Sequence, residues 1–317
     1  MQGMELYKLV HSMSSAEKRF FKMHSQSRSK PEELSYLRLF DLLNGQKSYD
    51  PLAIKNAFAN EGYSKYLSWA QNNLFSLLLE SERIYCHKKE VRYQLDAFLQ
   101  DIRFLVQRKI FSKSEKLIKK ALQMAKKYDQ QQIVIELLEI SRLLLMEQQQ
   151  RGYEAKVLGI NEEIKIFAER FNAKVLLENL YRELVLASRI TTQMRKAKLE
   201  ESFGALLESP LLRDRSALQS FYAIHFYDLI HATYYHLAGE FEQALSYHES
   251  LFQHWEENAV MIAADYNLYQ RVLNNYLTGC QMTNRFDVFE EVLPKFFLSL
   301  AKSPNDAAEG FQLSLIH

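Results

Sequence analysis

Histidine and aspartate, side chains that bind metals or carry protons, are concentrated in the segment FYAIHFYDLIHATYYHLA after Ser220. We predict a helix here, with His225, Asp228, His231 and His236 along it. Ligands on one helix face need spacings of three or four residues. Asp228 shares a face with either His225 or His231, but those two histidines point about 120° apart. The pattern therefore favours polar groups that hydrogen bond at a helix contact over a metal site.

Sequence patterns that mark common enzyme classes are absent from the chain. No glycine cluster is arranged to cradle a phosphate, and there is no nucleophile elbow or Walker motif. The nearest approach to a zinc-hydrolase motif runs from His248 to Phe252, and Phe252 stands where the second histidine ligand would be. We therefore predict no catalytic, cofactor-binding or metal-binding residues and expect a protein that is not an enzyme.

Lysines follow one side of a predicted helix, opposite an apolar side formed by Leu117, Ala121 and Met124. They are Lys113, Lys116, Lys120 and Lys127. Such a stripe is suited to binding phosphates. A solvated outer face has the same pattern, and we favour that interpretation.

Residues 54–60 and the segment from Ser64 also fit a helix-turn-helix arrangement. The second helix would present polar side chains to a DNA major groove, namely Lys65, Ser68, Gln71 and Asn72. The same side chains would form the solvated side of a helical cap, with Trp69 and Leu74 in the core. Binding of nucleic acid through residues 1–130 stays open as an alternative that we do not favour.

The elements that position these groups are predicted to be helices. Only 9 Gly and 5 Pro occur in 317 residues, so turns are few and the elements between them are long. The hydrophobic content of 47% supplies a core, and no run approaches the ~18 apolar residues of a membrane span. Two distant cysteines and an N-terminus without a secretory pattern favour a cytoplasmic protein with no membrane partner.

The first part of the chain has clear helix boundaries. Ser14 and Glu17 form a capping box, which predicts a helix from Ser15. Residues 24–30 are predicted to form a loop before a helix that starts at Pro31 and ends at Gly45.

Further along, Asp50 and Pro51 mark another helix start. A helix from Ser64 to about Tyr85 follows, and we place a break at residues 86–88. This break divides the chain into an N-terminal helical bundle, residues 1–90, and a second domain, residues 91–317.

The second domain contains recurring bends. We place them at Phe111, Gly152–Tyr153, residues 195–197, Phe241 and Phe286, which gives separations of 42, 42, 46 and 45 residues. This period fits a pair of helices. A second capping box is predicted at Ser112–Glu115, and first helices of the pairs are predicted at 131–150, 173–192, 216–238 and 259–282. The apolar tail after Pro304 is expected to act as a C-terminal cap.

One bend carries a family resemblance. Around it stand Ala232, Tyr235, Gly239, Phe241 and Ala244, in the order small, aromatic, glycine, aromatic, small. This pattern resembles the tetratricopeptide repeat, and weaker likeness at the other bends extends the resemblance over residues 91–302. The resemblance implies an all-α fold in which a right-handed α-solenoid of helical hairpins follows the N-terminal bundle.

The resemblance also implies a binding groove, because the first helices of tetratricopeptide repeats line the inner face. The register set by Gly239 and Asn284 then places six polar side chains there: Thr233, His236, Arg271, Asn274, Thr278 and Gln281. The last four have spacings of three, four and three and form one stripe. Arg can hold a carboxylate and Asn or Gln can pair with a peptide bond, so we predict a peptide-binding groove, with a hydrated surface as the alternative.

Charge is distributed unevenly although the net charge is only +1. Residues 1–130 hold 23 Lys and Arg against 14 Asp and Glu, whereas residues 211–317 hold 6 against 13. Solvated faces of opposite sign are the favoured explanation; different partners at the two ends, or homo-oligomers formed by attraction between copies, are alternatives.

These features lead us to expect a non-enzymatic scaffold that binds a protein or peptide segment in the groove of a helical-repeat array. The alternative is a transcriptional regulator with a DNA-binding N-terminal head and a ligand-sensing or dimerising repeat domain. That layout resembles bacterial peptide-pheromone receptors.

Overall fold

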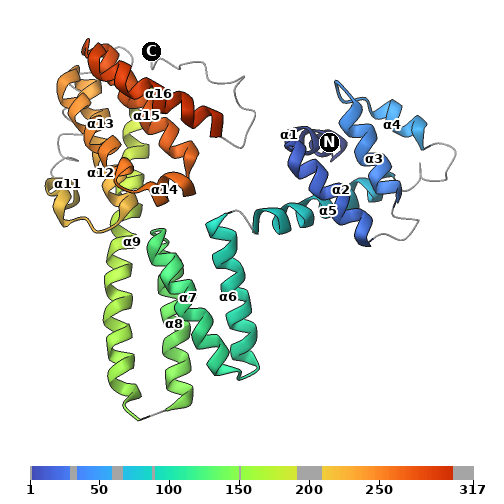
Figure 1. Cartoon of the computed structure of the whole chain (residues 1–317), viewed down its shortest axis with the longest axis horizontal. Coiled ribbons are helices and arrows are strands. Elements are labelled where there is room, and N and C mark those ends of the chain that lie inside the picture. The colour runs from blue at the N-terminus through green and yellow to red at the C-terminus, as the bar shows by residue number, and fades with distance from the viewer. Residues whose placement is uncertain are drawn as a thin grey trace. The chain divides into compact units, whose positions relative to one another are not determined.

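A computed structural model of the chain describes residues 2–28, 34–58, 67–87, 90–149, 151–190 and 209–302 (Figure 1). All regular elements within these ranges are helices, which confirms the all-α prediction. The chain divides into two compact units, Met1–Gln94 and Leu95–Ser303. None of the helices in the described ranges combines the length and apolar character needed to cross a membrane.

Unit 1 is a bundle around α5, which packs against three of the other helices, α1, α2 and α3. Its core includes Leu6, Phe21, Phe40, Ile54 and Leu74, all nearly or fully buried. The helices of this unit are α1 (Gln2–Ser12), α2 (Ser15–Arg28), α3 (Leu34–Gly45), α4 (Pro51–Ala57) and α5 (Leu67–His87).

Two predicted helix starts in unit 1 are confirmed by their caps. The backbone N–H of Ser14 donates to the Glu17 carboxylate at 2.7 Å, and the N–H of Glu17 donates to Ser14 Oγ at 3.3 Å. Asp50 Oδ1 accepts from the N–H groups of Leu52 and Ala53 at 2.9 and 3.0 Å. These side chains satisfy backbone donors that the first helical turn leaves without partners.

The loop predicted at residues 24–30 is wrong as far as Arg28, because α2 continues to that residue. The sequence between His24 and Arg28 contains neither Gly nor Pro, so nothing in it ends the helix. The predicted starts at Pro31 and Ser64 lie outside the described residues. The predicted break after Tyr85 agrees with the end of α5 at His87 and the start of α6 at Val91.

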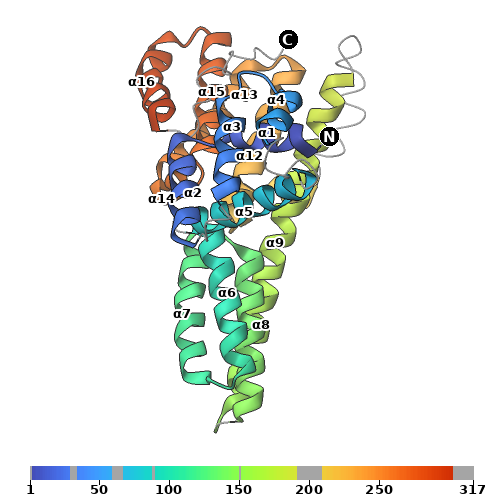
Figure 2. The ribbon, with the colours of Figure 1, turned by 90° about the vertical axis from the view of Figure 1, so that its right-hand side faces the viewer.

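Unit 2 is a succession of helices in which each long helix from α7 onward packs against the next long one. In Figures 1 and 2, α9 runs beside α8 along one part of its length and beside α12 further on. The helices are α6 (Val91–Gln107), α7 (Phe111–Lys127), α8 (Gln131–Gln148), α9 (Tyr153–Ile190), α11 (Pro210–Arg213), α12 (Phe221–Ala238), α13 (Phe241–Glu256), α14 (Ala259–Ala264), α15 (Tyr266–Met282) and α16 (Phe286–Lys302), with a 3₁₀ turn at Arg215–Ala217.

Helices begin at four of the predicted bends, namely Phe111, Tyr153, Phe241 and Phe286. The turn before Phe241 contains Gly239 with φ +80°, and the N–H of Glu240 donates to the Tyr235 carbonyl at 2.8 Å. This is the Schellman arrangement that satisfies carbonyls at a helix end. The predicted bend at residues 195–197 and the C-terminal cap lie outside the described residues.

The same turn recurs without glycine at three other places in unit 2. Lys109, Asp129 and Asn284 have φ values of +59°, +53° and +58°. In each case the next N–H donates to a carbonyl five residues earlier, at 3.0, 2.8 and 2.8 Å. The helix predicted at 131–150 is observed as α8, which packs against both α7 and α9.

Two predicted helix boundaries in unit 2 are wrong because a helix continues or breaks where the pattern did not show it. A separate helix at 173–192 was expected, but α9 is continuous from Tyr153 to Ile190. The helix predicted at 259–282 is broken into α14 and α15, because Asp265 accepts from the N–H of Leu268 at 2.9 Å and starts a new helix.

Two helix starts are also displaced. The capping box predicted at Ser112 is wrong, because α7 starts at Phe111 and Ile110 occupies the N-cap position. The helix predicted from Ser216 begins instead at Phe221, where Ser220 is the N-cap and accepts from the N–H of Ala223.

Candidate functional site

The polar residues of α12 form a buried hydrogen-bonded contact. Asp228 is fully buried, and the Arg215 guanidinium donates to both carboxylate oxygens over 2.9 to 3.1 Å. Ser250 Oγ adds a longer bond of 3.4 Å from α13. Burial raises the pKa of Asp228, and the bonds from Arg215 oppose that rise. The ion pair therefore fastens the 3₁₀ turn to α12.

Two histidines of the same helix also have structural partners. The indole N–H of Trp255 donates to Nδ1 of His225 at 3.1 Å, and burial lowers the pKa of His225 to about 3. His231 Nε2 lies 3.3 Å from the Leu212 carbonyl, to which it donates. The preference for hydrogen-bonded groups at a helix contact is thus confirmed for Asp228, His225 and His231. Among the described residues no group of His, Cys, Asp or Glu is arranged to hold a metal ion.

A cavity of about 560 Å³ lies between α9, α12, α13 and α15. Each of these helices contributes lining residues, and along α15 the lining extends from Arg271 to Met282. The lining residues are Tyr181, Val185, Ser188, Thr233, His236, Leu237, Phe241, Ala244, His248, Arg271, Asn274, Asn275, Thr278, Gly279 and Met282.

The structure brings together most of the predicted groove residues. Five of the six line this cavity: Thr233, His236, Arg271, Asn274 and Thr278. Gln281 is exposed and does not line it, because α15 turns this side chain outward at the helix end. Leu229, one helical turn before Thr233 on α12, is buried in the core of unit 2.

Arg271 supplies a positive charge at the cavity. Arg271 is exposed to solvent and forms no ion pair with a described residue, and none of the lining residues is Asp or Glu. Tyr181 stands near Arg271, and burial raises the pKa of its phenol, so it stays protonated as a donor. A negatively charged group that enters the cavity meets a guanidinium without a competing carboxylate.

His248 is the one histidine of the zinc-hydrolase-like string, and it lines the cavity from α13. Burial lowers its pKa to about 4, and the nearby His236 adds to the effect, so the ring is neutral near pH 7. Its Nδ1 is buried without a hydrogen-bond partner among the described residues. Phe252, at the end of the string, stacks on Tyr276 at 5.1 Å between ring centroids and serves the core.

Close packing shapes the cavity floor at Gly279. A Cβ atom placed there would lie 3.1 Å from Leu245 Cδ1 and 3.6 Å from His248 Cδ2. The glycine therefore lets α15 approach α13. The sequence did not predict the cavity residues of α9, because a helix boundary was placed near residue 173. It did not predict Asn275 either, because this residue lies beside the predicted polar stripe that includes Arg271, Asn274 and Thr278.

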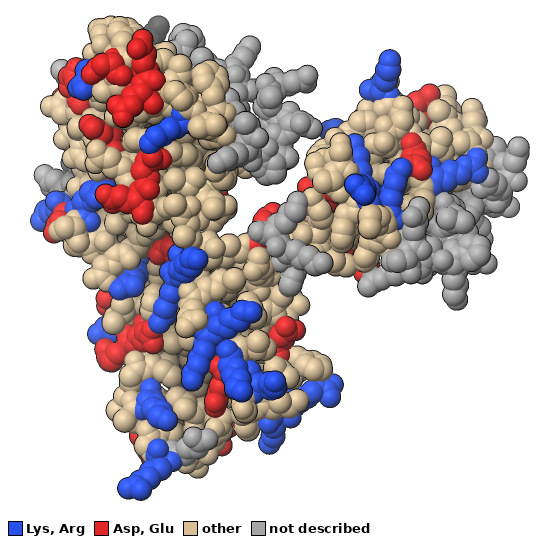
Figure 3. Space-filling view, viewed as in Figure 1, with Lys and Arg blue, Asp and Glu red and all other residues tan. Residues whose placement is uncertain are grey.

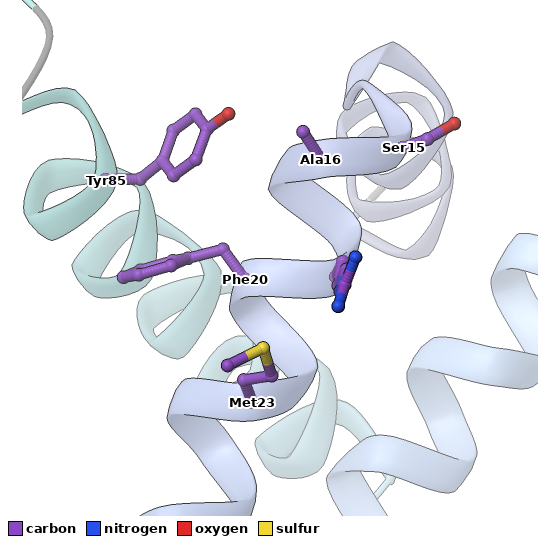
Figure 4. A pocket seen from close by; sticks show the side chains of 6 residues that line it. Ser15, Ala16, Phe20, Met23 and Tyr85 are labelled. Atoms are coloured by element: carbon purple, nitrogen blue, oxygen red, sulfur yellow. The ribbon is translucent and has the colours of Figure 1, made fainter.

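Unit 1 has a smaller and more open hollow of about 390 Å³ between α2 and α5 (Figure 4). Phe20 and Tyr85 line it and lie next to each other, with ring centroids 5.3 Å apart. Its other lining residues are Ser15, Ala16, Arg19 and Met23. Arg19 is the single charged group that lines it, so it offers less scope for polar recognition than the cavity of unit 2.

Three of the four residues proposed for DNA contact lie on α5. Ser68 and Asn72 are exposed and Gln71 is half-buried, whereas Lys65 lies outside the described residues. Leu74 is buried as predicted, but Trp69 is 56% exposed, which corrects its assignment to the core. Trp69 lies on the outer side of α5, where its ring is 6.2 Å from that of Tyr36.

Comparisons of the chain with protein-family models, with curated proteins and with solved structures give no match.

Proposed function

We propose that this protein is a non-enzymatic scaffold that binds a peptide or protein segment in the cavity of unit 2. The observation that carries the proposal is the gathering of Arg271, Asn274, Thr278, Thr233 and His236 around one cavity. We further propose that the successive helix pairs of unit 2 form a tetratricopeptide-like solenoid and that this cavity belongs to its inner face. The Schellman turns before α13 and α16 support an equivalent start for these helices.

The length of the cavity supports an extended ligand. From Arg271 to Met282, α15 rises about 16 Å at 1.5 Å per residue. A fully extended peptide of about five residues covers the same length. The cavity therefore accommodates a short segment lying along α15.

The chemistry along this length changes from polar to apolar. At one end Arg271 and Tyr181 provide donors, and Asn274 and Asn275 provide amides that pair with both groups of a peptide bond. At the other end Leu237, Phe241 and Met282 supply apolar surface. We infer a segment with an acidic or polar residue at one end and an apolar side chain at the other.

The test uses peptides selected from a random library on the wild-type protein, with dissociation constants measured by fluorescence anisotropy. The double variant Arg271→Ala/Asn274→Ala should weaken binding at least ~10-fold, since a charge-assisted hydrogen bond contributes about 1.5–3 kcal/mol. Its melting temperature should stay close to wild type, because neither side chain is part of the core.

The matched control is the variant Arg213→Ala/Gln281→Ala, which also removes one guanidinium and one side-chain amide, but outside the cavity. Both side chains are exposed, so binding should be retained. Equal affinities for the two double variants would show that the selected peptides bind elsewhere and would refute the proposal.

A further inference from the structure

The exposed face of α7 carries a stripe of lysines that the cavity does not use. This helix contains six Lys and one Glu. Four of the lysines, Lys113, Lys116, Lys120 and Lys127, are exposed and lie on one side of the helix. The stripe is about 21 Å long at 1.5 Å per residue. Figure 3 shows basic side chains gathered where Figure 1 places α7.

None of these four lysines forms an ion pair with a carboxylate in the described part of the chain. The ion pair of α7 with Glu163 uses Lys126, which is outside the stripe, and Glu115 accepts instead from Gln148. The positive charges of the stripe are therefore not neutralised within the protein.

Two of the ammonium groups are held in place by aromatic rings. Lys120 Nζ lies 5.1 Å from the centroid of Phe98, and Lys127 Nζ lies 5.5 Å from that of Tyr128. A cation–π contact positions an ammonium group but leaves its hydrogen bonds free for an anion. Part of the side-chain entropy that anion binding would cost is thus already lost in the free protein.

The opposite side of α7 is occupied by the core. Ile118, Ala121 and Ala125 are buried, and α7 packs against α8. None of the large apolar residues of α7 is exposed, so this helix has no side chains to insert between lipids. The stripe is suited to a rigid polyanion that presents phosphates at its surface.

We propose that the lysine stripe of α7 binds the phosphate backbone of double-stranded nucleic acid without reading its sequence. One strand of a duplex places a phosphate about every 3.4 Å along the axis and winds around that axis, so a straight 21 Å stripe meets only some of the phosphates in this length. Each of the four lysines can contact one of them. Lysine ammonium groups act there as point charges, which secure affinity but carry no sequence information. This activity is separate from the peptide cavity.

The experiment measures binding of the full chain to a short DNA duplex and to an RNA duplex by fluorescence anisotropy. With about four phosphates contacted, affinity should fall roughly 100-fold between 50 and 200 mM salt. Replacing three lysines by glutamine, whose helix propensity is similar, should weaken binding at least ~10-fold at low salt and reduce the log–log salt slope by about three. This variant is Lys113→Gln/Lys116→Gln/Lys120→Gln.

The control removes the same net charge from exposed positions elsewhere in unit 2, in the variant Arg151→Gln/Lys156→Gln/Lys165→Gln. It should bind duplexes within about threefold of wild type, because only net charge and not the stripe has changed. Equal losses in both variants would overturn the proposal. So would unchanged binding by the lysine variant, no binding to either duplex at low salt, or binding to phosphatidylserine vesicles in place of duplexes.

Discussion

Replacement of Arg215 by Met tests the account of the α12 contact, because it removes the main partner of a fully buried carboxylate. Asp228 has no exposed side-chain surface, whereas the Arg215 side chain is 37% exposed. Loss of one partner from a buried ion pair costs about 3–5 kcal/mol. The partial exposure of Arg215 lets water screen the pair, so we expect the lower end, about 3 kcal/mol. Ser250 at 3.4 Å is too distant to compensate.

The assay is urea unfolding followed by tryptophan fluorescence. The chain has two tryptophans, Trp69 in unit 1 and the buried Trp255 in unit 2. In a Trp69→Phe background the tryptophan fluorescence therefore follows the unfolding of unit 2 alone. Addition of Asp228→Asn to the Arg215→Met variant should restore part of the stability, because no buried charge remains.

An exposed neighbour provides the matched control. Arg213→Met should change stability by less than about 0.5 kcal/mol, since Arg213 is exposed at the end of α11. A loss below about 1 kcal/mol for Arg215→Met, or a loss that Asp228→Asn fails to reduce, would refute the reasoning.

Two further predictions concern acid stability and a helix end. The folded state keeps His225 neutral with a pKa of about 3, whereas the unfolded chain binds a proton below about pH 6.5, so stability falls as the pH falls. Urea unfolding should show that this residue lowers the free energy of unfolding by about 2 kcal/mol between pH 6.5 and 5. The His225→Asn variant should lack this part of the pH dependence, and identical pH profiles for the variant and the wild type would contradict the prediction. Gly239→Val should cost at least about 1 kcal/mol, because φ is +80° although a Cβ would meet no atom within 4 Å. Gly159→Ala, at a helical glycine that is equally open, should raise the melting temperature, and a neutral result at Gly239 would contradict the argument.

The sequence predicted helix boundaries well where a side chain satisfies the backbone in a recognisable way. The caps at Ser14 and Asp50 and the turn at Gly239 are of this kind. The turns at Lys109 and Asp129 have the same geometry without glycine. Their left-handed residues are held by hydrogen bonds to the preceding helix, and residue type alone does not reveal this.

The uninterrupted α9 could not be inferred from the repeat period. Its sequence contains no breaker between Gly159 and Ile190, and it packs against both α8 and α12. Five cavity residues were still predicted, because Gly239 and Asn284 fix the ends of α12 and α15. Tyr181 was not predicted because it belongs to α9, and the sequence pattern does not show that α9 packs beside α12.

Steric blockage of the cavity is the most direct test of the central claim that it binds a peptide segment. Thr233 lines the cavity from α12 and is half-buried, so Thr233→Trp would fill part of the ~560 Å³ that a ligand needs. Gln281→Trp adds the same side chain at an exposed position outside the cavity. With both variants folded by thermal melting, titration of a peptide selected on the wild-type protein should show at least ~10-fold weaker binding for Thr233→Trp and unchanged binding for Gln281→Trp. Wild-type affinity in the Thr233→Trp variant would contradict the account.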